Sequence, residues 1–586
     1  MNMNTVPRPE HPQPMMKRDN WQNLNGEWLF EFDFGNSGAE RGLFKPENKD
    51  KYSKKITVPF CPESELSGIN YKDFIPAVWY KRTANITAEQ LKNRVLLHFG
   101  AVDYECTVYV NGKTAGNHFG GYSSFTLDIT DFLSVGENDI TVNAKDNVRG
   151  GDQPKGKQAS LYYSSGCDYT RTTGIWQTVW LEFVPDGYIK TAKYYPDIED
   201  GAFDIELTVT RDGSLTVEAF YDGKAVGNTH KNISGGYARL HLPLAEKHLW
   251  EPGNGRLYDL KFTYKTENGT DVLFSYAGLR DVRIDGFKVL INGKSVFQRT
   301  VLDQGFYPDG IYTAPSDAAL KRDIELSMQL GFNGARLHEK MFEPRFLYYC
   351  DKAGYLVWGE HANWGLDINR DSSLLNFLPE WSETVERDFN HPAIIGWCPF
   401  NETCWSQTSE RAFRVVKAVY DETKRLDPTR PVIDSSGGFH VKTDIYDQHD
   451  YDQNPESFKK SYSGYNGAAE SFNLHFGDKQ VYIPNLPFFL SEFGGIKWIP
   501  EEKREGSAEN SWGYGDAPET EEEFFTRYEG LVSALTDAPN IMGFCYTQLY
   551  DVEQEVNGLY TYSREKKFAD YSRIIAANSK KAAIED

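Results

Sequence analysis

The second half of the chain constrains the fold most, because short apolar runs alternate there with segments of helical periodicity. Residues 317–330, 409–426 and 521–535 carry apolar side chains at helical spacing and are polar elsewhere. Apolar runs expected to be strands lie between them, at 333–337, 355–358, 394–400, 431–434, 488–490 and 541–546. Strands alternating with helices over about 300 residues predict a (β/α)8 TIM barrel. An open doubly wound sheet is the alternative, but no glycine-rich phosphate loop follows its first strand.

The first 285 residues have a different pattern, in which short strands are separated by turn residues. Residues 94–99, 106–110 and 124–129 have the composition and alternation of strands, and Asn111-Gly112 after the second is a strong hairpin signal. This pattern predicts a jelly-roll β-sandwich. The alternation resets at Asp186, and the next 100 residues or so fit an immunoglobulin-like β-sandwich.

These patterns divide the chain into four parts. Residues 1–18 are rich in proline and lack the apolar core of a signal peptide, so we expect a flexible arm. A jelly roll is expected over 19–185, an immunoglobulin-like sandwich over 186–285 and a TIM barrel over 286–586.

Charge and composition exclude several classes of partner. The 586 residues carry a formal net charge of −22, which argues against nucleic acid or an anionic membrane surface. No apolar stretch reaches the roughly 18 residues needed to span a bilayer. The seven cysteines are scattered without CxxC spacing, which is typical of reduced thiols in a cytoplasmic protein. The 13 Trp and 35 Tyr could stack on sugar rings, although a large β-rich core would also use them.

Two of the predicted barrel strands end on carboxylates. The run from Ile394 leads to Asn401-Glu402, and the run from Phe488 leads to Glu492 and two glycines. A carboxylate at the end of a buried strand is costly unless something there uses it. Because functional residues of a barrel gather where its strands end, the two can face each other across one pocket. A single glutamate at such a place is more often an ion-pair partner or a helix cap, but two in matching settings favour catalysis.

Paired carboxyls are the machinery for cleaving a glycosidic bond. Glu492 suits the nucleophile, since the glycines after it would leave space for a sugar. Glu402 suits the acid/base, since its apolar surroundings would raise its pKa. Asn401 could hydrogen-bond a sugar hydroxyl next to the reacting carbon.

Short motifs along nearly the whole chain match one known family. They are 24–28, 108–112, 120–122, 174–181, 331–336, 350–354, 401–402 and 491–494. In their order and spacing the chain resembles glycoside hydrolase family 2, which includes β-galactosidases, β-glucuronidases and β-mannosidases. The resemblance implies a retaining mechanism with Glu492 as nucleophile and Glu402 as acid/base.

The resemblance also implies supporting roles for three residues. Asp168 stands where the family's jelly roll sends an acidic residue into the barrel mouth, or it caps a turn. Tyr451 stands where relatives place a tyrosine that hydrogen-bonds the nucleophile, or it belongs to the core. Arg336 would orient Glu492 by a charge-assisted bond, and a structural ion pair is compatible with that role.

Departures from the family pattern bear on the substrate and on metals. Glucuronidase members carry an Asn-x-Lys that grips the sugar carboxylate, whereas the aligned stretch here is 555–559, Glu-Val-Asn-Gly-Leu. Magnesium-dependent members carry Glu-x-His, whereas this chain has Glu360-His361. We therefore expect no metal and no cofactor.

Several further residues are candidates for contacts with the sugar. His338 could contact a hydroxyl, and Lys340 could pair with Glu339, with Glu360 or with a substrate carboxylate, unless it forms a solvated pair at the barrel rim. Asp303 and Gln304 follow the first barrel strand and would lie near the non-reducing sugar. Potential stacking platforms, each with an equally good interpretation as a core residue, are Trp364, Trp405 and Tyr546.

The sequence thus predicts a retaining exo-glycosidase that acts on a small glycoside or oligosaccharide, with a β-galactoside as the favoured substrate. A β-uronide, or a furanoside such as an arabinofuranoside or galactofuranoside, is the first alternative, and Lys340 motivates it. A catalytically silent carbohydrate-binding protein on the same fold is the second. Relatives often form dimers or tetramers, so a homo-oligomer is possible.

Overall fold

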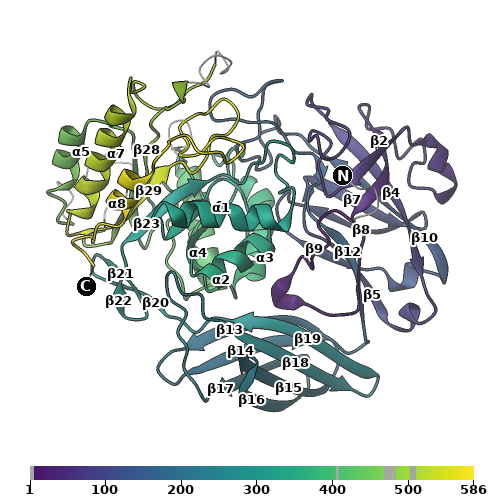
Figure 1. The fold of residues 1–586 in the computed structure, drawn as a ribbon. Helices are drawn as coiled ribbons and strands as arrows, with labels where there is room; N and C mark the ends of the chain where they lie inside the picture. Colours follow the sequence, from purple (N-terminus) through teal and green to yellow (C-terminus); the bar gives the residue numbers. More distant parts are fainter. Residues whose placement is uncertain (1–5, 404–407, 468–479, 481–482, 502–509, 586) are drawn as a thin grey trace.

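The computed structural model describes residues 6–403, 408–467, 480, 483–501 and 510–585. Two β-sandwiches and a barrel of parallel strands surrounded by helices follow one another along the chain (Figure 1). The fold class predicted from the sequence is therefore confirmed.

The first sandwich consists of two antiparallel sheets around one apolar core. The four-stranded sheet has the order β1 (Trp21–Asn23), β12 (Val179–Val184), β5 (Arg94–Phe99), β9 (Phe125–Asp128). The six-stranded sheet has the order β3 (Lys54–Val58), β2 (Gly26–Phe32), β4 (Ala77–Ile86), β10 (Gly136–Lys145), β7 (Glu105–Val110), β8 (Lys113–Phe119). A small pair, β6 (Val102–Asp103) and β11 (Gly174–Ile175), lies beside them. Asn111 and Gly112 form the β7–β8 hairpin turn with φ values of 50° and 77°, as their sequence predicts.

The second sandwich has a three-stranded and a four-stranded sheet with a core of its own. The orders are β13 (Ile189–Asp197), β14 (Ala202–Val209), β17 (Tyr237–Pro243), and β16 (Lys224–Ile233), β15 (Gly213–Tyr221), β18 (Tyr258–Thr266), β19 (Gly269–Ala277). The small sheet β20 (Val282–Asp285), β21 (Lys288–Ile291), β22 (Lys294–Ser295) leads into the barrel.

The N-terminal segment differs from the predicted mobile arm, because residues 6–18 pack on the rest of the molecule. Arg8 is 4% exposed and forms a two-pronged ion pair with Glu343. Arg18 bonds the carboxylates of Glu182 in the first sandwich and Asp271 in the second. These buried charge pairs fix a segment whose one helical turn is the short 3-10 helix η1 (Pro14–Met16).

Seven parallel strands form the barrel sheet. Their order is β26 (Ile394–Cys398), β25 (Leu356–Glu360), β24 (Gly334–Leu337), β23 (Gln298–Asp303), β29 (Ile541–Thr547), β28 (Phe488–Gly494), β27 (Tyr446–Asp450). The predicted strand at 431–434 takes the eighth place, since Trp397 and Asn401 make parallel bridges to Val432 and Ser436. The Ser436 hydroxyl donates to Asp447 of β27, which closes the ring.

Helices cover the outside of this ring (Figure 1). They are α1 (Asp317–Gln329), α2 (Pro344–Ala353), α3 (Ser373–Asp388), α4 (Glu410–Leu426), α5 (Pro455–Tyr462), α7 (Glu521–Thr536) and α8 (Ser572–Asn578). The three helices predicted from periodicity are α1, α4 and α7, and the Ser316, Ser409 and Thr520 side chains cap their N-termini. None of the helices in the described part of the chain is long and apolar enough to span a bilayer.

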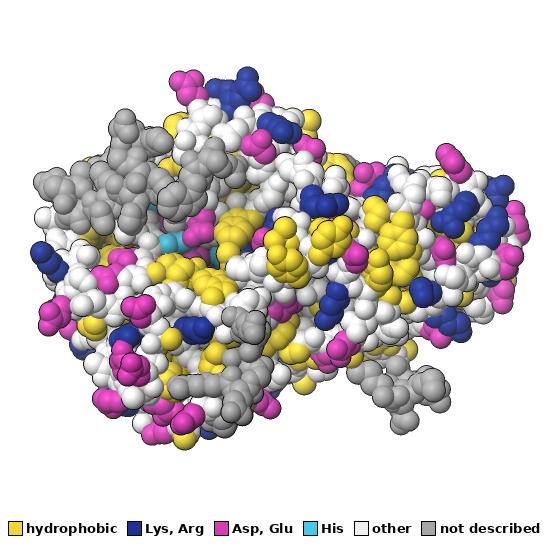
Figure 2. Space-filling model, turned by 90° about the horizontal axis from the view of Figure 1, so that it is seen from above, with side chains coloured by type: hydrophobic (Ala, Val, Ile, Leu, Met, Phe, Trp, Pro, Cys, Tyr) yellow, Lys and Arg dark blue, Asp and Glu magenta, His cyan; other side chains and the backbone are white. Residues whose placement is uncertain are grey.

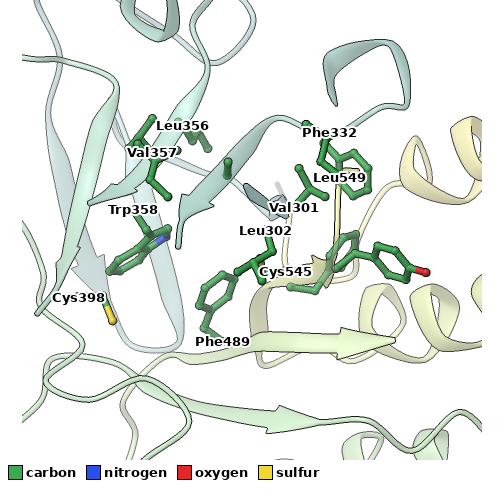
Figure 3. Packing of buried hydrophobic residues seen from close by; sticks show 14 of the residues in the cluster. Val301, Leu302, Phe332, Leu356, Val357, Trp358, Cys398, Phe489, Cys545 and Leu549 are labelled. Carbon is green, nitrogen blue, oxygen red and sulfur yellow. The ribbon is translucent and has the colours of Figure 1, made fainter. Parts of the chain in front are cut away.

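Large side chains fill the barrel interior and hold its strands in place (Figure 3). The Trp358 ring of β25 stacks on Phe489 of β28 with centroids 5.9 Å apart, and its N–H donates to Gln298 of β23 at 2.8 Å. This packing ties three strands together below the ends where Glu402 and Glu492 lie.

Candidate active site

Glu402 and Glu492 meet at the carboxyl ends of the barrel strands. One oxygen of each carboxylate and one ring nitrogen of His449 all lie within 4.8 Å of one another. Glu492 lies inside β28 and its side chain is only 5% exposed, whereas that of Glu402 is 28% exposed. Glu402 follows β26 and has a left-handed backbone, with φ of 50°, a conformation that non-glycine residues adopt at a cost. Seen from above, histidine and acidic side chains share a hollow bordered by hydrophobic ones (Figure 2).

Arg336 of β24 lies at the floor of the pocket and donates hydrogen bonds to four residues around it. One of its terminal nitrogens, Nη1, donates to Glu492 Oε1 at 3.2 Å and to the Ser491 carbonyl at 2.6 Å. Its Nε donates to Glu360 Oε1 at 2.5 Å, and Nη2 donates to Asn401 Oδ1 at 3.1 Å. The guanidinium is 1% exposed, so these charge-assisted bonds satisfy a cation that would otherwise be costly to bury.

Tyr451 holds the other oxygen of Glu492. Its hydroxyl donates to Glu492 Oε2 at 2.5 Å, and its ring stacks on Tyr514 with centroids 3.4 Å apart. The two glycines after Glu492 have φ values of 80° and 58°, and a side chain on either would collide with Tyr546 or Tyr514. The two glycines therefore permit a turn and the close packing of these rings. They do not leave open space for a sugar, as the sequence suggested.

His449 lies between the two carboxylates, and sequence reasoning missed it. Its Nδ1 is 2.8 Å from Glu402 Oε1, and its Nε2 is 3.4 Å from Glu492 Oε1. Burial lowers the pKa of His449, but the charges of Glu492 and Glu402 outweigh burial and raise it above the usual value. Both carboxylates therefore favour the protonated form of this imidazole, which lies between them. Its position two residues before Tyr451 was the one available signal.

The electrostatics of Glu402 differ from the prediction of a raised pKa. Burial raises the pKa of Glu402, but the hydrogen bond and charge of His449, together with Lys157, outweigh it and lower the pKa to about 2. The apolar neighbours in the sequence are not what the carboxylate faces, because a cation from β27 reaches it. Glu402 is ionised here and forms an ion pair with His449.

Asn401 and His338 complete the inner wall. The Asn401 backbone N–H donates to Asn363 Oδ1 at 2.7 Å, while its side-chain Nδ2 is buried and has no hydrogen-bond partner among the described residues. His338 Nδ1 lies 3.3 Å from Glu360 Oε2 and 3.8 Å from Glu492 Oε1. Burial and the charge of Lys157 lower the pKa of His338 well below its usual value, so this imidazole is neutral.

Lys340 does not face the pocket, contrary to the sequence-based hypothesis. Its ammonium donates to the carbonyls of Gly305 and Tyr312, the latter at 2.8 Å, and lies over the rings of Trp176, Tyr312 and Phe342. It pairs with neither Glu339 nor Glu360, and it is buried rather than solvated at the rim. Lys340 thus joins the barrel to Trp176 of the first sandwich.

Three other candidates also support the frame of the pocket. Asp303 accepts hydrogen bonds from the Gly305 N–H at 2.9 Å and from the Tyr550 hydroxyl. Gln304 donates to the Tyr169 hydroxyl at 2.9 Å and to Gln548 at 2.7 Å. Tyr546 is completely buried against Phe493 and Tyr528, so it is a core residue and not a stacking platform.

A long loop between β10 and β11 brings residues of the first sandwich to the barrel mouth. The Lys155 N–H donates to the Trp364 carbonyl at 2.7 Å, and the Gly156 N–H donates to the Ala362 carbonyl at 3.1 Å. Asp168 lies on this loop and pairs with Lys155 at 3.1 Å. Trp364 is half-buried under the ammonium of Lys157, which lies 3.5 Å from its ring centroid. Trp405 lies outside the described residues.

The residues at the positions of the family's metal motif and Asn-x-Lys motif form hydrogen bonds within the protein. Glu360 accepts from Arg336 and, at 3.3 Å, from the Glu339 N–H. Glu555 accepts from the Tyr169 hydroxyl and from Asn557. In the described part of the chain, the side chains spaced like metal ligands are Glu402, His449 and Glu492 themselves.

Comparison with known families decides the classification. The family model described as "Glycosyl hydrolases family 2, sugar binding domain" matches residues 21–185, and "Glycosyl hydrolases family 2, TIM barrel domain" matches residues 282–469. The chain belongs to glycoside hydrolase family 2. The resemblance inferred from the short motifs is therefore confirmed.

Individual family 2 relatives are distant in sequence. A putative β-glucuronidase of Formosa agariphila is 27% identical over 443 residues, which cover 72% of this chain and 51% of that protein. The match thus spans about half the length of that relative. The β-glucuronidase of Sus scrofa is 27% identical over 72% of this chain and 69% of its own, and the β-galactosidase of Thermoanaerobacter pseudethanolicus is 26% identical over 79% and 65%.

Solved structures of family 2 members share the fold. The β-glucuronidase from Ruminococcus gnavus in complex with D-glucuronic acid superposes with a TM-score of 0.79 at 20% identity, covering 96% of this chain and 99% of that one. The Lactobacillus rhamnosus β-glucuronidase gives 0.78 at 20% identity, covering 98% and 100%. At this identity the similarity establishes the architecture.

Proposed function

We propose that this family 2 chain is a retaining exo-β-glycosidase. Glu492 attacks the anomeric carbon while Glu402 protonates the departing glycosidic oxygen, and Glu402 then deprotonates the water that hydrolyses the glycosyl ester. The proposal rests on the separation of the two carboxylates, whose nearest oxygens lie within 4.8 Å. Retaining enzymes hold their carboxyls about 5 Å apart, whereas inverting ones need roughly 6.5–9.5 Å to admit a water.

The contacts of Glu492 suit a nucleophile. Arg336 and Tyr451 each donate to one of its oxygens, which stabilises the ionised form and fixes the direction of the lone pairs. The buried Asn401 Nδ2, which has no partner among the described residues, can donate to a sugar hydroxyl beside the reacting carbon.

The acid/base role needs a proton that Glu402 does not hold in the free enzyme. His449 carries that proton and bonds Glu402 directly at 2.8 Å. A bound sugar excludes water, and a lower local dielectric favours a neutral pair over an ion pair. The proton then passes from His449 Nδ1 to Glu402 and on to the leaving oxygen.

The loop from the first sandwich supports exo-action. It is anchored to the segment after β25 by the Lys155 and Gly156 N–H groups, and its Thr170 N–H donates to Glu553 at 3.1 Å. A loop fixed at both ends across the barrel mouth closes one side of the site, so we expect a terminal sugar to enter.

For the sugar itself, we place a β-uronide ahead of the β-galactoside that the sequence favoured. Most of the relatives described above are named β-glucuronidases, and one is named a β-galactosidase. The distant identity leaves the β-galactoside as the second candidate.

A panel of nitrophenyl glycosides tests the proposal with three variants. Glu492→Ala and Glu402→Ala should each lose on the order of 10³-fold or more in kcat, as expected when catalytic groups are removed. Azide should rescue Glu492→Ala with formation of the α-glycosyl azide, and Glu402→Ala with formation of the β-anomer. The exposed Glu89→Ala is the control. Wild-type turnover in both active-site variants, or an inverted product from the wild-type enzyme, would refute the assignment.

A further inference from the structure

Lys157 reaches the barrel mouth from the first sandwich, and no motif in the sequence marked it. It lies on the loop between β10 and β11, where its carbonyl accepts from the Tyr169 N–H at 2.7 Å. The neighbouring N–H groups of Lys155 and Gly156 fasten this loop to the backbone after β25. The position of Lys157 over the barrel is therefore fixed by main-chain bonds on both sides.

The ammonium of Lys157 is buried without the partners that such a group needs. The residue is 5% exposed, and its Nζ lies 3.5 Å from the ring centroid of Trp364. Among the described residues, no carboxylate oxygen lies within 4.0 Å of this nitrogen and no oxygen accepts a hydrogen bond from it. Lys155, two residues away, instead binds Asp168 at 3.1 Å and the Gln158 carbonyl at 2.6 Å. A cation–π contact alone leaves three N–H donors available.

Lys157 shares the pocket with the catalytic carboxylates. Burial lowers its pKa, but Cys167, Glu402, Glu339 and Glu492 are near enough to outweigh burial and raise it above the usual value. The ammonium thus remains protonated in a pocket that otherwise carries an excess of acidic groups. An anionic ligand would be repelled from that pocket unless a cation met it.

The other cationic side chains around the site already donate hydrogen bonds to oxygen atoms of the protein. Arg336 distributes its donors among Glu360, Glu492, Ser491 and Asn401. Lys340 is turned toward the carbonyls of Gly305 and Tyr312. Within the described chain, Lys157 is the buried pocket cation whose N–H groups are available to a ligand.

We propose that Lys157 is a specificity-determining residue that binds an anionic substituent of the terminal sugar, a carboxylate or a sulfate ester. This inference rests on the proposed glycosidase function and deepens it, because it assigns the charge of the substrate to one side chain. The substituent would lie on the Trp364 side of the pocket, away from the anomeric carbon at Glu492.

The test compares charged with neutral substrates in Lys157→Met and Lys157→Arg. The substrates are the nitrophenyl β-D-glucuronide, the β-D-galactoside and its 6-sulfate. Lys157→Met should lower kcat/KM for the charged substrates by roughly 10- to 100-fold relative to the neutral one, the scale of a lost charged hydrogen bond. Lys157→Arg should retain part of the preference for charged substrates. Comparison of the glucuronide with the 6-sulfate shows whether the enzyme prefers a carboxylate or a sulfate ester. Lys340→Met, which removes a buried but engaged ammonium, is the matched control and should leave the ratio unchanged.

An unchanged ratio in Lys157→Met, or a wild-type enzyme that cleaves only neutral glycosides, would overturn the inference and leave the glycosidase assignment intact. Calorimetry decides the case in which no glycoside is cleaved. Wild-type protein should bind D-glucuronate in preference to D-glucose and lose that preference in Lys157→Met, whereas equal binding of both sugars would contradict the role of Lys157.

Discussion

The Tyr451 hydroxyl donates a 2.5 Å hydrogen bond to Glu492 Oε2, while Arg336 donates to Oε1 of the same carboxylate at 3.2 Å. The two donors come from different strand ends, β27 and β24, so they approach the carboxylate from different sides. Together they fix the position of the carboxylate that we propose as the nucleophile.

Tyr451→Phe should therefore lower kcat by about 10- to 100-fold, the scale of one lost hydrogen bond to a charged group. Steady-state kinetics measure the loss. Tyr546→Phe, which removes a hydroxyl from the barrel core, is the control and should keep the wild-type kcat. A Tyr451→Phe enzyme with the wild-type kcat would limit Tyr451 to a structural role.

His449→Asn tests where the catalytic proton resides. In the wild-type protein the pKa of His449 is raised by Glu492 and Glu402, whereas that of Glu402 is lowered to about 2. Without the imidazole the proton must be held by the Glu402 carboxyl, whose ordinary pKa is lower than that of histidine. The alkaline limb of kcat/KM should then move to lower pH. An unchanged alkaline limb would show that His449 does not hold the proton.

The meeting of Glu402 and Glu492 was predictable because both carboxylates follow apolar runs that are visible in the sequence. The strand β27 was not, since it reads Tyr-Asp-Gln-His-Asp and has no apolar run; His449 was missed with it. Helix α3 was missed because it contains Pro379, and α2 because it is short and starts at Pro344. Sequence periodicity predicts which residues form a helix or strand. It does not predict where the charged end of a long side chain lies. For that reason the sequence pointed to Lys340, whose ammonium binds backbone carbonyls, and did not mark Lys157, whose ammonium lies over Trp364 at the barrel mouth.

Lys340→Met tests the structural role of that lysine through stability. Burial lowers the pKa of Lys340 to about 7 from 10.5, despite the opposing charges of Glu343 and Asp303. A lysine with a lowered folded-state pKa destabilises the fold at low pH, and the penalty disappears as pH rises from about 7 toward the unfolded value. Wild-type protein should gain thermal stability relative to Lys340→Met over that interval. Calorimetric melting temperatures from pH 6 to 10 measure the difference, and a constant difference would contradict a buried ammonium.

Glu380 should make the stability of the wild-type protein fall as pH rises, the opposite of the effect of Lys340, and Glu380→Gln should weaken that fall. Glu380 of α3 is completely buried and accepts from the Tyr122 N–H of the first sandwich at 2.7 Å. Burial raises its pKa to about 8 from 4.5. The stability that a raised carboxyl pKa contributes is complete below the unfolded value and is lost as pH rises through the folded one. Wild-type protein should therefore lose stability between about pH 4.5 and 8, by up to a few kcal/mol at ~1.4 kcal/mol per pKa unit.

The amide of Glu380→Gln can still accept from Tyr122 and does not ionise, so the variant should lose less stability over the same interval. Glu383→Gln is the matched control, because Glu383 lies one turn further along α3 and bonds the Ser123 hydroxyl of the same segment at 2.6 Å, but is 41% exposed. Denaturant melts at pH 5, 6.5 and 8 give the slopes. Parallel slopes for wild type and Glu380→Gln would mean that this carboxyl ionises freely in the folded protein.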